Sequence, residues 1–376
     1  MKKKRKVSAH LLLNPELLYS PPNDAIINAL IEEGYEVHIY GPNMGNDSTD
    51  YGDSVRTFFI SYTWKWIFTH ILDWKWKKYD LYSGTSEDPL GIVGLLSFVY
   101  QKPSFSLVDE IKSGSYRGDR SEYWKKLCKW GIKRSIFKIV NDSSRVELLA
   151  EYVGINKTSS IMVYPGCFKE PIETDESVRD KIRRKWGFPG EAIIIGSSGG
   201  FNMTSGADWL IRYMNEWETG YTVIQPLGVS DLSIYLLGEL RCNNRMYVEK
   251  KRLSWQEAWI EAQGLDIGIC IYTNPAPQFQ HMGVSSNRLC MFIAMGVPVI
   301  ASKQESFSFI EEYNCGRLVS DYMEFNTAIE DMKRNLDQLR MNCKICLREY
   351  IKPGNAYKEL KERIRHIKDR KVNFID

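Results

Sequence analysis

Apolar and polar positions alternate along this chain in two repeating patterns. Short runs dominated by apolar residues, as at residues 265–272 and 297–300, have the length of strands, and the stretches between such runs repeat apolar residues at the spacing of helices. Strands that are apolar at consecutive positions are typical of parallel sheets covered on both faces. Because strands and helices of this kind alternate over most of the chain, the pattern predicts an α/β fold built on parallel sheets.

The N-terminal residues predict one strand–helix–strand unit. Residues 7–14 form the first expected strand, Asn23 or Asp24 caps a helix over residues 25–33, and residues 35–40 form the second strand. No G-x-G-x-x-G sequence lies between the first strand and the helix. The unit is therefore Rossmann-like but lacks the dinucleotide-binding fingerprint.

A second unit of this kind, with a glycine-rich loop, lies near the middle of the chain. A strand is expected over residues 192–195 and a helix from Ala207, and the glycines between and around them are at positions 196, 199, 200 and 206. Glycines in such a loop let backbone amides approach an anion closely, so the loop predicts a diphosphate-binding segment.

The most informative stretch is residues 283–302, GVSSNRLCMFIAMGVPVIAS. A polar loop leads into an expected helix over residues 287–295, which Gly296 ends because glycine tolerates the left-handed conformation, and an apolar strand follows. The amide groups and the positive end of the dipole at a helix N-terminus attract phosphate. Arg288, in the first helical turn, can add a bidentate contact to the same anion.

These motifs resemble the GT-B glycosyltransferases, especially the large retaining family with the pattern S-P-x-K-L-x-E-Y-x-A-x-G-x-P-V-I. The resemblance is carried by residues 283–302 and continues into the residues after them and into the earlier glycine loop. The matching positions are Ser285, Ser286, Arg288, Ala294, Gly296, Pro298, Val299, Ile310, Glu311, Gly316, Leu318 and Val319, with Gly196, Gly206, Asp208, Leu210 and Ile211 in the glycine loop.

The resemblance implies a GT-B fold, in which two Rossmann-like domains face each other across a cleft and C-terminal helices cross back. The N-terminal, acceptor-binding domain is expected over residues 1–168. The C-terminal domain, which binds the nucleotide-sugar donor, is expected over residues 169–350. A last helix, within residues 351–376, is expected to pack on the N-terminal domain.

The resemblance also implies a set of donor-binding residues, and two of them depart from the family pattern. Ser205 stands where the family has the lysine that neutralises the pyrophosphate, and Met291 stands where it has the glutamate that binds the ribose. Arg288 is the expected stabiliser of charge on the leaving group. The donor-binding candidates are Gly199, Gly200, Phe201, Asn202, Ser205, Tyr272, Gln280, His281, Val284, Ser285, Ser286, Asn287, Arg288 and Met291.

Carboxylates follow two expected strands of the N-terminal half. Strand C-termini in an open α/β sheet face the binding crevice, so Glu87, Asp88, Asp109 and Glu110 are candidate catalytic residues beside Arg288. The alternative is that these carboxylates cap helix N-termini. The acceptor-binding candidates are Asn14 and, in a glycine-containing loop, Tyr116, Arg117 and Arg120.

Residues 64–78, WKWIFTHILDWKWKK, combine four tryptophans with four lysines. Aromatic residues beside lysines suit a surface at the level of lipid headgroups, and hence peripheral membrane contact or a lipid-linked acceptor. The alternative is a packed helix whose lysines extend from one face into solvent. The sequence leaves both interpretations open.

Bulk properties narrow the functional classes. The 376 residues suffice for two domains, and a net charge of only +3 argues against a protein that coats nucleic acid. Eight scattered cysteines suggest reduced thiols in a cytoplasmic protein, and the single CxxC at Cys343 and Cys346 is weak evidence for a metal or redox centre. The basic residues 2–6 are interpreted as a lead-in to the first strand, since the apolar run after them is too short for a signal peptide.

The sequence therefore predicts a cytoplasmic glycosyltransferase that moves a hexosyl group from a nucleotide diphosphate sugar to a glycan or lipid-linked acceptor, in bacterial surface polysaccharide or glycoconjugate synthesis. The resemblance implies retention of configuration, and no D-x-D occurs in the sequence, so we expect neither a metal nor another cofactor. The main alternative is a non-catalytic glycosyltransferase-like scaffold. A sugar-nucleotide epimerase is a third interpretation.

Overall fold

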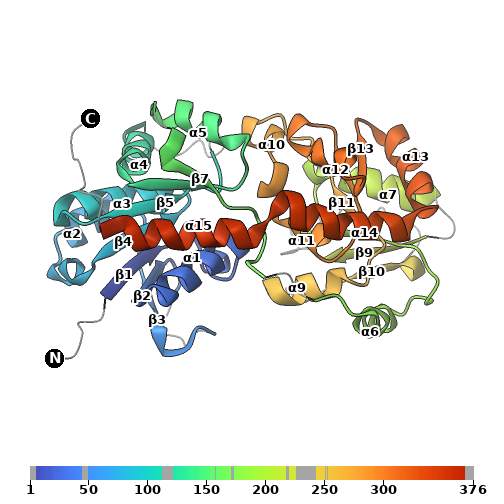
Figure 1. Ribbon diagram of the computed structural model, residues 1–376, viewed down its shortest axis with the longest axis horizontal. Coiled ribbons are helices and arrows are strands. Elements are labelled where there is room, and N and C mark those ends of the chain that lie inside the picture. The colour runs from blue at the N-terminus through green and yellow to red at the C-terminus, as the bar shows by residue number, and fades with distance from the viewer. Residues whose placement is uncertain are drawn as a thin grey trace. The chain divides into compact units, whose positions relative to one another are not determined.

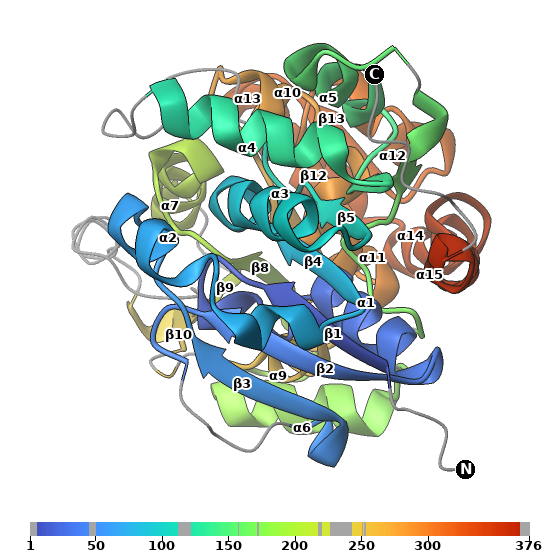
Figure 2. The same ribbon diagram turned by 90° about the vertical axis from the view of Figure 1, so that its left-hand side faces the viewer.

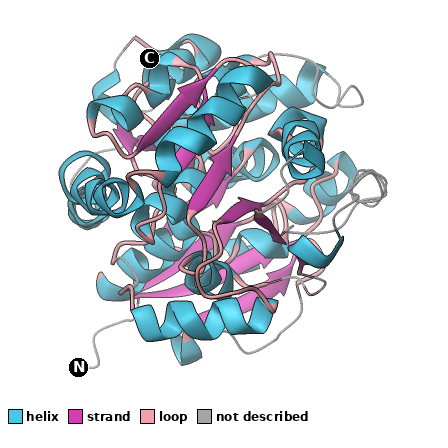
Figure 3. Ribbon diagram, turned by 90° about the vertical axis from the view of Figure 1, so that its right-hand side faces the viewer, coloured by secondary structure: helices cyan, strands magenta, loops and turns pink. Residues whose placement is uncertain are grey.

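The computed structural model describes residues 6–44, 50–111, 122–156, 158–170, 173–216, 220–225, 243–249, 251 and 253–368. The chain divides into two compact units (Figure 1). The first contains Met1–Tyr164 together with Gly354–Asp376, and the second contains Pro165–Pro353. Each unit is a parallel sheet with helices packed against it, so the expected α/β fold with two Rossmann-like domains is confirmed (Figure 3).

The sheet of the first unit has, among the described residues, seven parallel strands in the order β3-β2-β1-β4-β5-β6-β7. Its centre pairs β1 with both β2 and β4, so that Ala9 lies opposite His38 on one side and Tyr82 on the other. The strands are β1 (Lys6–Leu11), β2 (Tyr35–Gly41), β3 (Val55–Phe59), β4 (Leu81–Thr85), β5 (Ser104–Leu107), β6 (Phe137–Val140) and β7 (Ile161–Val163).

Helices cover both faces of this sheet. One face packs on α1 (Pro21–Glu32) and the C-terminal α15 (Pro353–Arg365), whose Leu360 and Ile364 are buried. On α15, Tyr357 donates a hydrogen bond of 2.7 Å to Glu32. The other face is covered by α2 (Trp64–His70), α3 (Glu87–Tyr100), α4 (Glu122–Arg134) and α5 (Arg145–Val153) (Figure 2).

The first unit corrects several expected boundaries. Helix α1 begins at Pro21 after the N-cap Ser20, and not after Asn23 or Asp24, because proline fits the first helical turn without losing a hydrogen bond. Glu87 and Asp88 are in the first turn of α3 and not in a loop. Strand β3, at the edge of the sheet, was not predicted, because only Val55 and Thr57 of its five residues are buried.

The second unit contains a parallel sheet whose described strands follow the order β10-β9-β8-β11-β12-β13. Its centre is β8, which pairs with β9 and β11, so the segments that follow β8 and β11 emerge side by side. The strands are β8 (Ile194–Ser198), β9 (Tyr221–Gln225), β10 (Met246–Val248), β11 (Ile267–Cys270), β12 (Val299–Ser302) and β13 (Gly316–Val319).

Two apolar clusters fill the faces of this second sheet. One lies under α7 (Ala207–Glu216) and α13 (Tyr322–Lys333), and the other, on the opposite face, contains residues of α6 (Glu176–Trp186), α9 (Trp255–Ala262), α11 (Asn287–Ala294) and α14 (Leu336–Cys346). The short helices α10 (Pro277–Gln280) and α12 (Phe309–Glu312) complete the unit. Cys343 and Cys346 are fully buried in the second cluster.

One expected boundary differs in the second unit. Strand β8 extends to Ser198, so Gly196 is inside the strand and the glycine loop starts at Gly199. After β13, two helices, α13 and α14, follow in sequence and are continued by a π-helical turn over Leu347–Ile351.

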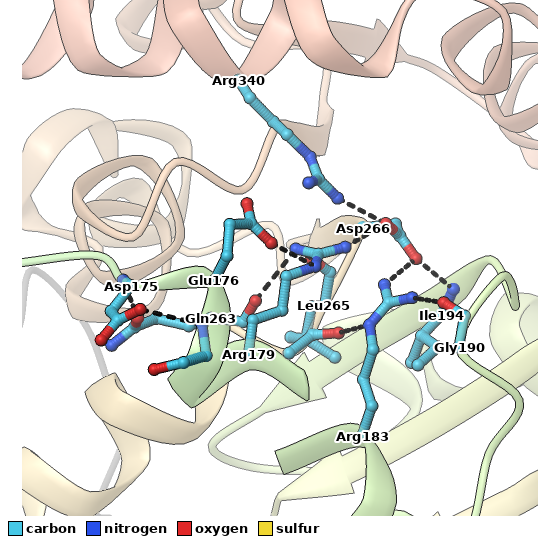
Figure 4. A network of polar contacts seen from close by, with 12 residues as sticks. Asp175, Glu176, Arg179, Arg183, Gly190, Ile194, Gln263, Leu265, Asp266 and Arg340 are labelled. Atoms are coloured by element: carbon cyan, nitrogen blue, oxygen red, sulfur yellow. Dashed lines mark hydrogen bonds and ion pairs between the residues drawn. The ribbon is translucent and has the colours of Figure 1, made fainter. Parts of the chain in front are cut away.

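A buried carboxylate, Asp266, joins four segments of the second unit (Figure 4). It precedes β11 and forms three ion pairs. Two, of 2.6 Å each, are with Arg179 and Arg183 on α6, and the third, of 2.5 Å, is with Arg340 on α14. It also accepts a hydrogen bond of 2.8 Å from the backbone N–H of Ile194, the first residue of β8. Asp266 is 3% exposed, so these contacts form in a region from which water is largely excluded.

Removing the charge of Asp266 will destabilise the second unit. Asp266→Asn leaves arginines without their carboxylate in a buried site, a change that typically costs about 3 kcal/mol or more. For a unit of this size, we expect Tm to fall by on the order of 10 °C, measured by circular dichroism. Asp331→Asn is the matched control, since Asp331 forms an exposed pair with Arg334 at 3.6 Å. Equal Tm values for both variants would contradict the role assigned to Asp266.

Candidate functional site

The N-terminus of α11 is held by its own N-cap residue and by a tyrosine that follows β11. Ser286 is the N-cap and accepts a hydrogen bond of 3.1 Å from the N–H of Leu289. Its hydroxyl lies 2.6 Å from the hydroxyl of Tyr272, just after β11. Burial raises the pKa of Tyr272, opposed by nearby Arg288, so its hydroxyl keeps its proton at neutral pH. Ser285, in the preceding turn, donates a hydrogen bond to the carbonyl of Met282.

The turn before α11 is fixed by residues that follow β12, which sequence reasoning missed. Gln304 accepts a hydrogen bond of 3.0 Å from the N–H of Met282, and Ser306 accepts one of 3.1 Å from the N–H of Gly283. Ser306 in turn donates to Gln304 at 2.9 Å. These two side chains hold the backbone of the turn in place, and nothing in their residue types marks them as different from ordinary loop residues.

The glycine loop after β8 is stabilised by its own side chains. Ser205 accepts a hydrogen bond of 3.0 Å from the N–H of Asn202 and donates one of 2.6 Å to the carbonyl of Gly200. Thr204 donates to the side chain of Asn202 at 2.8 Å, and Phe201 is 2% exposed. Ser205, Asn202 and Phe201 therefore shape this loop, and Ser205 uses its hydroxyl inside it.

Arg288 brings the glycine loop and the α11 N-terminus together. One guanidinium nitrogen is 3.3 Å from the carbonyl oxygen of Gly200, and the guanidinium carbon lies 5.8 Å from the centre of the Tyr272 ring. Gly199 has φ +81°, and a Cβ added there would be 3.1 Å from Nη2 of Arg288. Glycine is thus favoured at 199 by its backbone conformation, and any Cβ there would contact the end of the arginine side chain tightly.

The other donor-binding candidates make separate contacts within the second unit. Asn287 lies against Gly166, where an added Cβ would be 2.4 Å from the Asn287 side chain. The carbonyl of Val284 accepts a hydrogen bond of 2.8 Å from the N–H of Gly166. Met291 is 3% exposed and packs in the apolar core. Gln280 donates a hydrogen bond of 3.1 Å to the carbonyl of Asn274, and His281 follows it at the end of α10.

The candidate carboxylates of the first unit are held by neighbouring side chains. Glu87 accepts a hydrogen bond of 2.6 Å from Tyr152, and Asp88 accepts one of 2.8 Å from the indole of Trp124. Both oxygens of Asp109 are 2.9 Å from the hydroxyl of Ser86. Ser86 has φ 71°, which is a strained conformation for a residue other than glycine.

Two of these carboxylates and one acceptor candidate lie at the ends of parallel strands. Asp109 and Glu110 follow β5, and Asn14 follows β1, where its side chain accepts a hydrogen bond of 3.2 Å from the N–H of Leu17. Carboxyl ends of parallel strands meet at one edge of the sheet. Tyr116, Arg117 and Arg120 lie outside the described residues.

A buried polar network at the same edge was not predicted. His10 in β1 is fully buried, with Nδ1 2.8 Å from the hydroxyl of Ser83 and Nε2 3.0 Å from the side-chain oxygen of Asn23. Thr85 donates to the same Asn23 oxygen at 2.5 Å. Burial lowers the pKa of His10 to about 4, and a neutral ring satisfies both contacts by accepting from Ser83 and donating to Asn23.

The protonation of His10 makes the first unit sensitive to acid. The folded-state pKa of about 4 lies below the ordinary 6.5 of the unfolded chain, so between these values the unfolded state binds more protons. The contribution of His10 is complete above pH 6.5 and is lost as the pH falls toward 4, by roughly 3 kcal/mol at most. Urea unfolding of wild type and His10→Leu across this range should show a shallower pH dependence in the variant. Parallel curves would contradict the assignment.

The position of Gly199 gives a second testable consequence. Gly199→Ala forces an unfavourable backbone conformation and displaces Arg288, so we expect the affinity for a nucleoside diphosphate to fall roughly tenfold in calorimetry. Gly187→Ala is the control for the backbone alone, since Gly187 has φ +74° with no atom within 4 Å of an added Cβ. Gly190→Ala, which has neither feature, should behave as wild type. Equal affinities for the nucleoside diphosphate in all three variants would show that Gly199 is not part of the binding site.

Comparison with known structures identifies the fold. No known family profile matches the sequence, and no curated protein sequence shows significant similarity to it. The structure of HepE from Anabaena in complex with UDP-glucose is similar with a TM-score of 0.74 and 15% identity, over 95% of this chain and 99% of that one. The two units therefore have the GT-B fold.

Other solved structures with this fold show that it serves more than one reaction. Sucrose-phosphate synthase from Thermosynechococcus elongatus is similar with a TM-score of 0.71 and 13% identity, over 97% of this chain and 100% of that one. The UDP-GlcNAc 2-epimerase of Neisseria meningitidis, bound to UDP-GlcNAc, is similar with a TM-score of 0.63 and 12% identity, over 96% and 99%. The GT-B fold alone therefore does not determine which reaction a protein catalyses.

Within the described part of the chain, no group of three or more His, Cys, Asp or Glu side chains has the arrangement of a metal site. The described helices likewise include none with the length and apolar composition needed to cross a bilayer.

Proposed function

We propose that this protein is a glycosyltransferase that binds a nucleotide diphosphate sugar in its second unit. The observation that supports this most strongly is the meeting of Arg288, the Gly199–Gly200 backbone and the N-terminus of α11. A guanidinium, a glycine loop and a helix N-terminus at one edge of a parallel sheet form an arrangement suited to a diphosphate. Similarity to a structure that holds UDP-glucose supports the choice of donor class.

The same groups supply the catalytic contribution of the second unit. When the bond between the sugar and the diphosphate breaks, negative charge grows on the departing phosphate oxygen. Arg288 and the backbone amides of Gly199 and Gly200 would stabilise that charge more in the transition state than in the bound donor, which lowers the barrier. We further propose, from the resemblance of the sequence, that transfer retains configuration and needs no metal ion.

The acceptor side of the proposal rests on the first unit. We propose a glycan or lipid-linked acceptor, bound by Asn14 and by Tyr116, Arg117 and Arg120 and used in bacterial surface polysaccharide or glycoconjugate synthesis. Glu87, Asp88, Asp109 and Glu110 are the candidates for accepting the proton of the attacking hydroxyl. A cytoplasmic enzyme with a lipid-linked acceptor must reach a membrane, and we propose that residues 64–78 provide that contact.

Replacing Arg288 tests the donor site. Arg288→Ala removes a charged contact to the diphosphate, and such contacts are typically worth about 1.5–3 kcal/mol, so the affinity for UDP or GDP should fall by at least roughly tenfold in calorimetry. Arg184→Ala is the control, because Arg184 is an exposed residue of α6 in the same unit. Unchanged affinity in Arg288→Ala would exclude Arg288 from the site.

Turnover separates transfer from the other functions of this fold. With a mixture of acceptors and UDP- or GDP-sugars, we expect release of free nucleoside diphosphate that continues in EDTA. Loss of activity in EDTA with recovery in manganese would contradict the metal-independent proposal. Conversion of a UDP-sugar into its epimer without an acceptor would assign epimerase chemistry instead.

A non-catalytic scaffold remains the second candidate because of two specific residues. Ser205 and Met291 stand where the resembling family carries charge, and here Ser205 closes the glycine loop while Met291 fills the core. Ser205→Lys would therefore break the loop and lower the affinity for UDP or GDP, rather than add a useful charge. Failure of the wild-type protein to bind any nucleotide sugar at millimolar concentration would favour the scaffold.

A further inference from the structure

One short stretch of the first unit exposes several large apolar side chains. Phe68 is 78% exposed, Leu72 is 75% exposed and Trp74 is 84% exposed, and Trp64 is 38% exposed at the start of α2. Trp64 and Phe68 are four residues apart in α2, and their rings stack with centroids 6.0 Å apart, while Leu72 and Trp74 follow the end of the helix. We refer to Trp64, Phe68, Leu72 and Trp74 as the apolar ridge.

The other apolar residues of this stretch anchor it to the sheet. Trp66 and Ile67 are buried against the first unit, and Trp76 is fully buried, with its indole donating a hydrogen bond of 3.0 Å to the carbonyl of His70. Three residues per turn in the 3₁₀ helix Trp74–Lys78 place Trp74 and Lys77 on the same outer side. Residues 64–78 therefore combine a few core residues, Trp66, Ile67 and Trp76, with a larger set of exposed side chains.

Positive charge lines the ridge. The stretch carries Lys65, Lys75, Lys77 and Lys78 against one carboxylate, Asp73, which pairs with Lys75 at 3.3 Å. Lys65 and Lys77 are both exposed. In the sequence, Lys65 is three residues before Phe68, and Lys77 is three residues after Trp74. An apolar surface bordered by lysines complements a bilayer of anionic lipids. The acyl chains of the lipids contact the apolar side chains, and the anionic headgroups contact the lysines.

Helix α4 extends this surface. The ring of Trp64 contacts that of Trp124 on α4, with centroids 5.1 Å apart in an edge-to-face arrangement. Next to Trp124, Tyr123 is 76% exposed, and the ammonium of Lys126 lies 6.0 Å from the Tyr123 ring. The first turns of α2 and α4 therefore both carry aromatic and basic side chains, and α4 also begins with one acid, Glu122, which pairs with Lys125 at 2.9 Å. The views in Figures 1 and 2 show both helices on the same side of the sheet.

We infer that the apolar ridge and the adjoining first turn of α4 dock on an anionic lipid bilayer, with Phe68, Leu72 and Trp74 entering the headgroup region. This membrane contact rests on the proposed function, because a lipid-linked acceptor requires the enzyme to reach a membrane. It adds to that function the side chains that make the contact and the negative charge of the lipids. The contact is peripheral, since aromatic side chains of a short helix reach only the interface of a bilayer.

Vesicle binding tests the ridge. The wild-type protein should sediment with vesicles of phosphatidylcholine and phosphatidylglycerol at low salt, and much less with phosphatidylcholine alone. The double variant Phe68→Ser/Trp74→Ser should bind the anionic vesicles at least roughly tenfold more weakly. The matched control is Met323→Ser/Met341→Ser, which removes apolar side chains that are 67% and 61% exposed in the second unit. The control should bind as wild type.

The lysines are tested separately. Lys65→Gln/Lys77→Gln should weaken binding to anionic vesicles by roughly 20- to 30-fold, since each lysine near such a surface contributes roughly a fivefold gain. Lys181→Gln/Arg184→Gln makes the same change in net charge on an exposed face of α6 and should leave binding unaffected.

Two results would overturn the inference. The first is a wild-type protein that ignores anionic vesicles at low salt, or control variants that weaken binding as much as the ridge variants. The second is concentration-dependent self-association, in sedimentation velocity, that the ridge variants abolish, because the ridge would then be an interface between copies of this chain. UDP affinity measured on the same variants should stay unchanged, so a failure of the membrane contact is distinguished from a failure of donor binding.

Discussion

The buried carboxylate of Asp266 connects strands and helices of the second unit. It lies immediately before β11 and binds the N–H of Ile194 at the start of β8, so it fixes these two neighbouring strands relative to each other at their amino ends. The glycine loop leaves the carboxyl end of β8, and Tyr272 follows the carboxyl end of β11. A shift between the two strands would separate Gly200 from Arg288. The candidate site at one edge of the sheet therefore depends on the ion pairs at the other edge.

These ion pairs also connect distant parts of the sequence. Arg179 and Arg183 come from α6, near the start of the unit, and Arg340 comes from α14, near its end. Burial of charge is costly, but the arginines also donate to backbone carbonyls, as Arg183 does to Gly264 at 3.0 Å and to Gly190 at 2.8 Å. The cluster therefore attaches α6 and α14 to the strands β8 and β11.

Much of the fold and part of the site follow from local sequence rules. The expected helix after residue 286 is present as α11, and Gly296 has the positive φ that its position after the helix requires. The α/β pattern is confirmed because buried parallel strands have a simple apolar signature. Arg288 and Gly199, candidates from separate motifs, meet in space because β8 and β11 are neighbours in the sheet.

The remaining features depend on contacts between residues far apart in the sequence. His10 and Ser83 are joined by the pairing of β1 with β4, and no local pattern indicates that pairing. Gln304 and Ser306 acquire their role only when the end of β12 reaches the turn before α11. Exposed and buried tryptophans of residues 64–78 alternate according to how α2 and the following 3₁₀ helix pack, which composition cannot specify.

We propose that the second unit holds a nucleotide diphosphate sugar between its glycine loop and the N-terminus of α11. Hydrogen–deuterium exchange of the whole chain can be measured with and without a saturating nucleotide sugar. Binding at this site should slow exchange at residues 199–206 and 282–289 and leave exchange at residues 64–78 unchanged. Protection confined to other segments, or no protection by any UDP- or GDP-sugar, would contradict it.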